Sequence, residues 1–225
     1  MASCVQANSF DPPSGTRLPT FWKAEPGAEG RVLRYAVVRA TFTSEETYRR
    51  VVEDMKAATA DWVAACPECG IAFEHVETQD KMESLAEFEA LAAQDKLRFI
   101  VFLNDAGGEF IAAAFFPSDP VTRRLVRIDP SYFKLEGTGY DGRGVLRHEL
   151  GHVLGYRHEH IQPEAGCWAE DDRWKAFTDY DSKSVMHYLC GSGGTHALSI
   201  SDCDAQGHRK VYAGIEPTTC RVKRD

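Results

Sequence analysis

The chain has 225 residues, which suffices for one large domain or two small lobes around a real hydrophobic core. Its 26 Lys and Arg residues against 34 Asp and Glu residues give a formal net charge of −8, and this acidic balance argues against nucleic acid as a partner. No apolar run approaches the ~20 residues that a membrane-spanning helix needs. The composition therefore predicts a soluble, folded protein without a membrane span.

The N-terminal part is predicted to hold an arm, a strand and a long helix. Residues 1–30 are rich in Pro, Gly, Ser and Thr and indicate an extended arm, and residues 31–38 are β-branched and apolar, as a first strand requires. Thr43 and Glu46 form a capping box, and the helix that they begin should end at the CPECG segment, 66–70. One face of this helix carries Tyr48, Val51, Val52, Met55, Thr59, Trp62 and Val63.

Shorter strands and helices are predicted downstream. Strands are expected at 71–76, 97–103, 109–116 and 124–128, and helices at 83–94, 142–154 and 202–212. The first of these helices has an apolar face of Leu85, Phe88 and Leu91, and the last begins with Ser201 as N-cap and Asp204 three residues on. Strands and one long helix come first and irregular chain later, which predicts an α+β fold of two lobes.

The segment HELGHVLGYRHEH, residues 148–160, carries the most specific pattern in the chain. His148 and His152 are four residues apart, so both imidazoles project from one face of a helix and can share a metal ion. Gly155 can adopt the left-handed conformation that ends the helix and turns the chain back, so that His158 supplies a third nitrogen. Three protein ligands leave a zinc ion an open position for water, as in a catalytic site.

Glu149 sits beside the first histidine, where it reaches a water on the metal without being a ligand. Zinc lowers the pKa of such a water to roughly 7 and polarises a carbonyl oxygen, while a carboxylate can take and return the proton. A lone pair of histidines at helical spacing is more often a surface accident than a metal site. Here the pattern fixes five positions across eleven residues in a chain with 8 His, so chance is a poor account of it.

The same segment resembles the long zinc signature of the metzincin metalloendopeptidases, and two more features resemble the astacins within that clan. Glu159 follows the third histidine directly, and SVMHY at 184–188 is similar to the astacin Met-turn. This resemblance implies that Met186 forms the hydrophobic floor beneath the zinc. It also implies that Tyr188 is an extra ligand that swings away to stabilise the oxyanion. The segment 199–214 resembles the C-terminal helix of the astacins.

The resemblance implies a metzincin-type zincin fold, with a twisted mixed sheet and long helices in an N-terminal lobe at 31–155. An irregular C-terminal lobe with a final helix would occupy 156–225, and the arm at 1–30 is interpreted as a remnant of a pro-segment. Metzincins place an edge strand above the zinc helix, where its free N–H and C=O groups bind an extended peptide. In this chain the edge strand would comprise Ile111, Ala112, Ala113, Ala114 and Phe115. A plain sheet edge is the alternative.

We therefore expect a secreted, monomeric zinc endopeptidase with one catalytic Zn²⁺ and a protein or peptide substrate. The N-terminal MASCVQANSF lacks the basic start and apolar stretch of a signal peptide, so the expectation of secretion presumes a signal already removed. Two other interpretations stay open. One is a catalytically silent zinc-binding interaction module on a protease fold, against which the intact Glu149 argues. The other is a zinc hydrolase of small amides.

The cysteine count favours an oxidising compartment and leaves one cysteine over. Seven cysteines are present, and Cys66 and Cys69 would form a local disulfide or pair elsewhere. The chain lacks the Phe-x-Gly-Asp segment with which astacin proenzymes block the zinc, and a thiolate is a good zinc ligand. We hypothesise that Cys4 binds the zinc in a latent form. The alternative is a Cys4–Cys220 disulfide that joins the two ends of the chain. Mature astacins bury their new amino terminus near the glutamate that follows the third histidine. This chain keeps the arm ahead of its first strand, so the sequence leaves the partner of Glu159 open.

Overall fold

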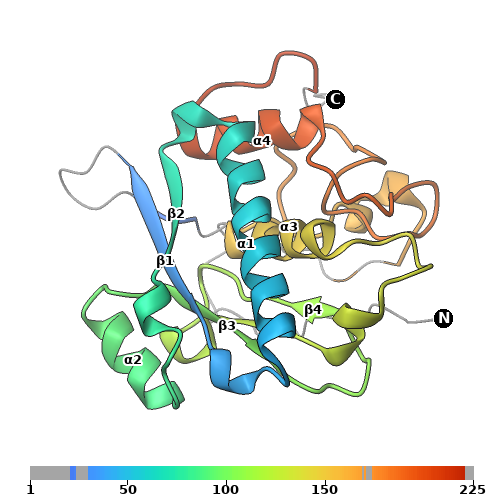
Figure 1. Cartoon of the computed structure of the whole chain (residues 1–225). Helices are drawn as coiled ribbons and strands as arrows, with labels where there is room; N and C mark the ends of the chain where they lie inside the picture. Colours follow the sequence, from blue (N-terminus) through green and yellow to red (C-terminus); the bar gives the residue numbers. More distant parts are fainter. Residues whose placement is uncertain (1–20, 24–29, 169, 171–173, 221–225) are drawn as a thin grey trace.

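The computed structural model describes residues 21–23, 30–168, 170 and 174–220 (Figure 1). Most of the predicted arm, and Cys4 with it, lies outside these residues. The described chain forms a five-stranded sheet and four α-helices. The predicted α+β class with a mixed sheet is therefore confirmed.

The sheet is mixed, with the strand order β2-β1-β3-β5-β4. The strands are β1 Arg31–Val37, β2 Ile71–His75, β3 Phe99–Leu103, β4 Ala112–Ala113 and β5 Leu125–Ile128. The pairs β1–β2, β1–β3 and β3–β5 are parallel, and β4 alone runs antiparallel to its neighbour β5. The antiparallel strand thus forms one edge of the described sheet.

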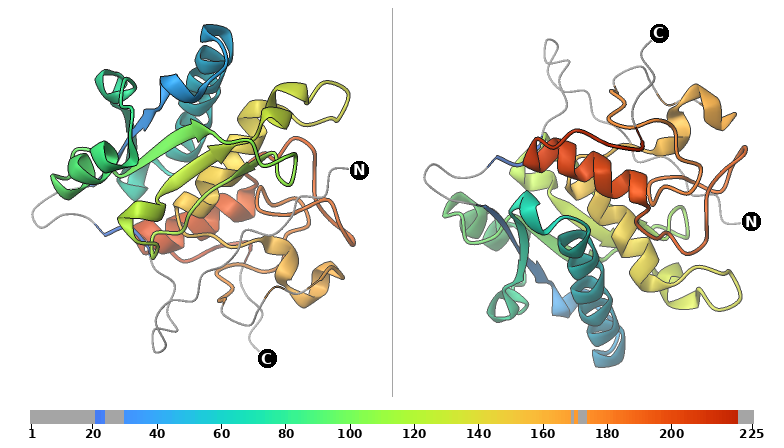
Figure 2. Two further views of the ribbon diagram at one scale, coloured as in Figure 1. Left: turned by 90° about the horizontal axis from the view of Figure 1, so that it is seen from below. Right: turned by 90° about the horizontal axis from the view of Figure 1, so that it is seen from above.

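The helices lie on both faces of the sheet. They are α1 Glu45–Ala65, α2 Leu85–Ala93, α3 Gly142–Val153 and α4 Asp202–Ala213. The main core lies where α1 and α3 pack against one face of the sheet, and α2 covers the other face with a smaller cluster around Phe88. Seen from above and from below (Figure 2), α3 lies between α4 and the strands. The helix with the zinc signature is therefore enclosed on several sides.

Two details of the predicted helices are wrong. The capping box of α1 is formed by Ser44 and Thr47, not by Thr43 and Glu46: Ser44 Oγ accepts from the Thr47 N–H, and Thr47 Oγ1 accepts from the Ser44 N–H. A hydroxyl at the third helical position thus replaces the expected carboxylate. In α2 Phe88 is buried as expected, but Leu85 is 44% exposed because it is the first residue of the helix, at the rim of its apolar face.

The strand predicted at 109–116 is reduced to Ala112–Ala113. Pairing with β5 extends only over Ile128↔Ala112 and Arg127↔Ala113, two of the four residues of β5. Beyond the strand, the Phe116 N–H donates to the carboxylate of Asp119, which turns the chain away. Ala114 and Phe115 of the predicted substrate-binding strand therefore follow the regular strand rather than extending it.

Residues 21–23 of the predicted arm pack against the body of the protein. The Trp22 indole Nε1–H donates to the Val153 carbonyl at 2.7 Å, and Arg31 Nε donates to the Trp22 carbonyl at 2.8 Å. Phe21 packs against the rings of Tyr156 and Tyr212. These contacts attach this part of the arm to the C-terminal end of α3.

Three disulfides join six of the seven cysteines: Cys66–Cys69, Cys167–Cys190 and Cys203–Cys220. Of the two alternatives left open for Cys66 and Cys69, the structure has the local disulfide. The alternative Cys4–Cys220 pairing is wrong, because Cys220 is bonded to Cys203 in the turn that follows α4.

No helix in the described part of the chain is both long enough and apolar enough to cross a membrane.

Candidate metal centre

Helix α3 holds three polar side chains in the interior of the protein. Asp141 caps its N-terminus by accepting from the Gly144 N–H at 2.6 Å. His148, Glu149 and His152 are all at least 93% buried, which is exceptional for three polar side chains on one helix. Burial of this kind requires compensating partners or a ligand. The helix thus presents its signature residues to an enclosed site.

A Schellman turn ends α3 and directs the chain back over it. Gly155 has φ 99°, and its N–H donates to the His152 carbonyl, while the Tyr156 N–H donates to the Gly151 carbonyl. The predicted left-handed role of Gly155 is thus confirmed. The turn also places the Tyr156 carbonyl 2.8 Å from His152 Nδ1. The same backbone that reverses the chain therefore orients the second histidine.

The three histidines of the signature converge on one point. Ligand atoms of His148, His152 and His158 all lie within 4.8 Å of one another, and the Nε2 atoms of His152 and His158 are 3.1 Å apart. Two nitrogens on one tetrahedral zinc ion lie about 3.3 Å apart, for bonds of about 2.0–2.1 Å. His148 Nε2 is buried and has no hydrogen-bond partner among the described residues. These features fit a zinc ion held by three Nε2 atoms.

Each of these imidazoles turns its Nδ1 away from the centre toward an acceptor. His148 Nδ1 donates to the Val185 carbonyl at 2.7 Å, and His158 Nδ1 donates to a carboxylate oxygen of Glu170 at 2.5 Å. His152 Nδ1 likewise donates to the Tyr156 carbonyl. In all three imidazoles Nδ1 therefore carries the proton, and Nε2 offers a lone pair to a metal ion. Burial lowers the pKa of His148 to about 4, which also favours the neutral form that metals bind.

The Met-turn packs against α3, the helix that carries His148 and His152. Met186 is buried and approaches Gly151 of α3 closely, while its carbonyl accepts from the Glu159 N–H at 3.0 Å. The carboxylate of Asp204 holds the turn by accepting from Ser184 Oγ and from the Val185 N–H. Asp204 therefore has two functions, because it is also part of the capping box of α4.

The contact between Gly151 and Met186 yields a prediction about stability. A Cβ on Gly151 would collide with Met186 Sδ, so Gly151→Ala should lower the free energy of unfolding by about 1–3 kcal/mol through overpacking. Gly207 in α4 is a matched control, because a Cβ there meets only Thr178 Cγ2 at 3.5 Å. Gly207→Ala should stabilise the protein by about 0.5–1 kcal/mol. Urea unfolding measures both, and equal effects at the two sites would contradict the packing that is described.

Tyr188 stacks beside the histidines rather than away from them. Its ring centroid lies 4.1 Å from that of His158 and 5.5 Å from that of His148. His187, the residue before it, is fully buried and bonded to the Tyr180 hydroxyl at 2.8 Å. The buried neighbour fixes the backbone next to Tyr188, so that the tyrosine ring is held at the metal centre.

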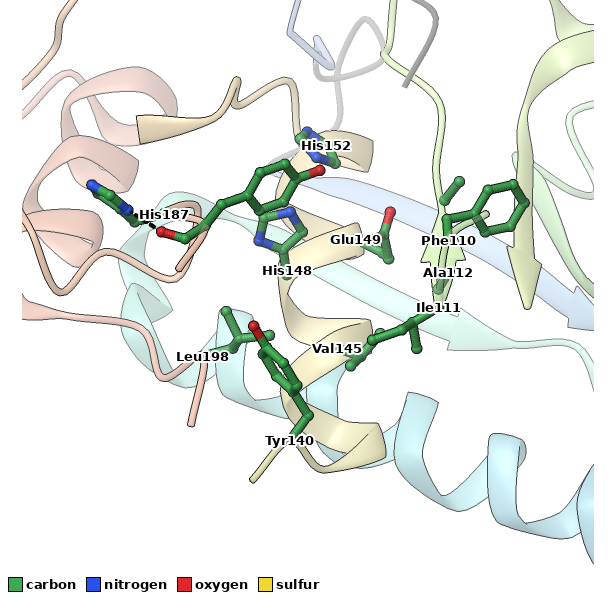
Figure 3. A pocket seen from close by; sticks show the side chains of 12 residues that line it. Phe110, Ile111, Ala112, Tyr140, Val145, His148, Glu149, His152, His187 and Leu198 are labelled. Carbon is green, nitrogen blue, oxygen red and sulfur yellow. Dashed lines mark hydrogen bonds between the residues drawn. The ribbon is translucent and has the colours of Figure 1, made fainter. Parts of the chain in front are cut away.

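A pocket opens over the centre, between α3 and the edge of the sheet. It is lined by Phe110, Ile111, Ala112, Ala113, Tyr140, Val145, His148, Glu149, His152, His187, Tyr188 and Leu198. Figure 3 shows Glu149 between α3 and the segment of Phe110 and Ala112. Burial raises the pKa of Glu149 to about 8, and a backbone hydrogen bond from Ala114 opposes this effect. The pocket therefore brings together Glu149, two histidines of the signature and the edge strand.

Glu159 accepts hydrogen bonds from within the protein. Its Oε1 accepts from the Asp181 N–H at 2.8 Å and from Gln162 Nε2 at 2.6 Å. Burial raises the pKa of Glu159 to about 7. Among the described residues, these bonds link Glu159 to the segment before the Met-turn.

Several residues of the site were not predicted from the sequence. Glu170 contacts His158 from a position 12 residues further along, and Asp204 reaches the Met-turn from α4. Tyr140 and Leu198 line the pocket from loops. His158, His160 and Glu170 form a second group with the composition of a metal site. No spacing rule connects these residues, since each comes to the site through tertiary packing.

Part of the sequence is similar to that of a known zinc metalloproteinase. No family model matches the chain. It is 34% identical over 90 residues to zinc metalloproteinase nas-3 of Caenorhabditis elegans, a segment that is 35% of this chain and 29% of that protein. The chain thus matches less than a third of the length of this curated relative.

Two solved structures of myroilysin are similar to the chain. One is 17% identical, with a TM-score of 0.48, and the match covers 82% of this chain and 94% of that one. The other is 13% identical, with a TM-score of 0.44, and the match covers 84% and 88%.

Proposed function

Since the chain resembles the astacin-like zinc metalloproteases in sequence, we propose that it is a zinc-dependent endopeptidase. The observation that carries the proposal is the convergence of His148, His152 and His158. Two of these histidines, His148 and His152, line one pocket together with Glu149. A metal-binding interaction module has no need for a carboxylate at the metal, or for a pocket beside it. A hydrolase needs both.

The residues divide the chemistry of hydrolysis among them. A zinc ion on the three imidazoles supplies a Lewis acid for the scissile carbonyl and makes water more acidic. Glu149 takes one proton from the attacking water and gives it to the nitrogen of the leaving amine, so that the C–N bond breaks once the new C–O bond has formed. The Tyr188 hydroxyl donates to the carbonyl oxygen as negative charge develops there.

The edge of the sheet supports a protein or peptide as the substrate. Strand β4 pairs with β5 on one side, and its two residues border the pocket together with Ile111, which precedes them. An extended peptide can add to such an edge through backbone hydrogen bonds, which fits an enzyme that cleaves within a chain. Ala114 and Phe115 would extend this contact beyond the regular strand.

A casein digestion with and without a chelator tests the proposed function. Peptide bonds of casein should be cleaved, cleavage should stop when a chelator removes the metal, and added Zn²⁺ should restore it. Bound zinc without cleavage of casein would instead favour the interaction module. Hydrolysis of small amides alone would favour the small-amide hydrolase.

Secretion and latency complete the proposal. Three disulfides support an oxidising compartment and hence a secreted protein, and the monomeric state stays a prediction. Cys4 has no partner among the six paired cysteines, which leaves its thiol for the zinc in a latent form.

The latency hypothesis predicts that Cys4→Ser is active without proteolysis, whereas the parent chain needs the arm to be cut. Steady-state cleavage of a peptide by both proteins measures this difference. An equal rate for the two proteins would reject a role of Cys4 in latency.

A further inference from the structure

His158 differs from the other two histidines in the charge of its Nδ1 acceptor. His148 and His152 donate to backbone carbonyls, of Val185 and Tyr156. His158 donates instead to the carboxylate of Glu170, at 2.5 Å. A carboxylate is the stronger acceptor, so this hydrogen bond fixes the tautomer and makes Nε2 more basic than a carbonyl does.

Glu170 is itself held in place from two directions. Its other oxygen, Oε2, accepts from Arg157 Nη2 at 2.9 Å, so that the carboxylate bridges two consecutive residues, Arg157 and His158. Three residues before it, Cys167 is bonded to Cys190, which lies just after Tyr188. The loop with Glu170 is therefore tied covalently to the segment with the tyrosine of the site.

The distance of 2.5 Å between His158 Nδ1 and Glu170 is that of a hydrogen bond, and it is shorter than the separation of two ligand atoms on one zinc ion. A nitrogen and an oxygen on one zinc ion lie about 3.3 Å apart, as do two nitrogens. The 3.1 Å between the Nε2 atoms of His152 and His158, by contrast, is close to the distance required. The group of His158, His160 and Glu170 is thus explained by a hydrogen bond, with His160 3.8 Å from the carboxylate.

We propose that Glu170 is a positioning residue, which holds the third histidine, His158, in the orientation that binds the metal. This inference rests on the proposed zinc site, but it concerns a residue outside the signature. His158 follows α3 in an irregular segment, so the helix cannot orient it as it orients His148 and His152. The Glu170 carboxylate performs this function instead.

Zinc affinity, measured by competition with a chromogenic chelator, tests this role directly. Glu170→Ala should weaken zinc binding about 10–100-fold, the usual effect of losing such a partner. Glu170→Gln keeps an acceptor oxygen but no charge, so its loss should be smaller. The control is Glu164→Gln, which removes the same charge from an exposed residue of the short 3-10 helix Pro163–Ala165, six positions before Glu170, and should bind zinc like the parent protein.

Two further measurements distinguish a positioning role of Glu170 from a role as metal ligand or in folding. They are the number of zinc ions bound per chain and the unfolding midpoint of the metal-free protein. All variants should bind one zinc ion per chain, and the unfolding midpoint of metal-free Glu170→Gln should equal that of the parent. Parent-like affinity in both Glu170 variants would overturn the inference and leave the proposed function intact. A fall from two ions to one would also overturn it, because Glu170 would then be a ligand of a second ion. A parent protein that binds no zinc would overturn both proposals.

Discussion

Replacing Glu149 by glutamine is expected to lower turnover by about 10²–10⁴-fold while zinc stays bound. Glu149 lies next to His148 on α3, in the pocket between that helix and the segment of Phe110 and Ala112. A glutamine has almost the same shape and can still hold a water, but it cannot accept the proton. The histidine ligands remain untouched, so the loss should appear in turnover and not in metal content.

The rate of peptide cleavage and the zinc content of the same preparation test this expectation. Glu159→Gln is a useful control, because it makes the same change at the buried glutamate that binds the Asp181 N–H rather than lining the pocket. We expect it to reduce stability more than turnover. A Glu149→Gln protein that holds zinc and still cleaves at the parent rate would refute the assigned base.

The second large effect is expected for Tyr188→Phe, which should reduce kcat by about 10²-fold or more with little change in KM. The ring of Tyr188 packs against that of His158, and phenylalanine can keep this packing. The substitution removes only the hydroxyl, which is proposed to donate to the oxygen that becomes negative in the transition state. Substrate binding in the ground state should hardly change.

Steady-state kinetics on one peptide separates the two parameters. Tyr140→Phe serves as the control, because Tyr140 lines the same pocket while its ring packs against His196, 4.9 Å away. Its kcat should stay close to that of the parent. A change in KM alone for Tyr188→Phe would make Tyr188 a substrate-binding residue rather than a stabiliser of the transition state.

The core of the candidate site could be predicted because it depends on local geometry. The helical repeat brings His148 and His152 to one face, and Gly155 with its positive φ returns the chain toward them. Helix α4 was predicted for the same reason, since Ser201 and Asp204 are a local capping pair. Neighbouring cap candidates are harder to separate. Ser44 and not Thr43 is the N-cap of α1, and the two adjacent hydroxyls are nearly equivalent in the sequence.

Contacts between distant segments could not be predicted from spacing. Glu170 reaches His158 through a loop tied by the Cys167–Cys190 disulfide, and the sequence alone allows many pairings of six cysteines. The edge strand was overestimated, because an apolar run does not reveal where the chain turns away from β5, as it does at the bond between the Phe116 N–H and Asp119. The contact of Glu170 with His158 and the length of β4 both depend on tertiary packing.

The most direct test of the account is a titration of the metal-free protein with Zn²⁺, followed by cleavage of an internal peptide bond. The account predicts that activity rises linearly and stops rising at one zinc ion per chain, with His148, His152 and His158 as its ligands. Saturation of the site with one zinc ion and no cleavage of any peptide bond would contradict it.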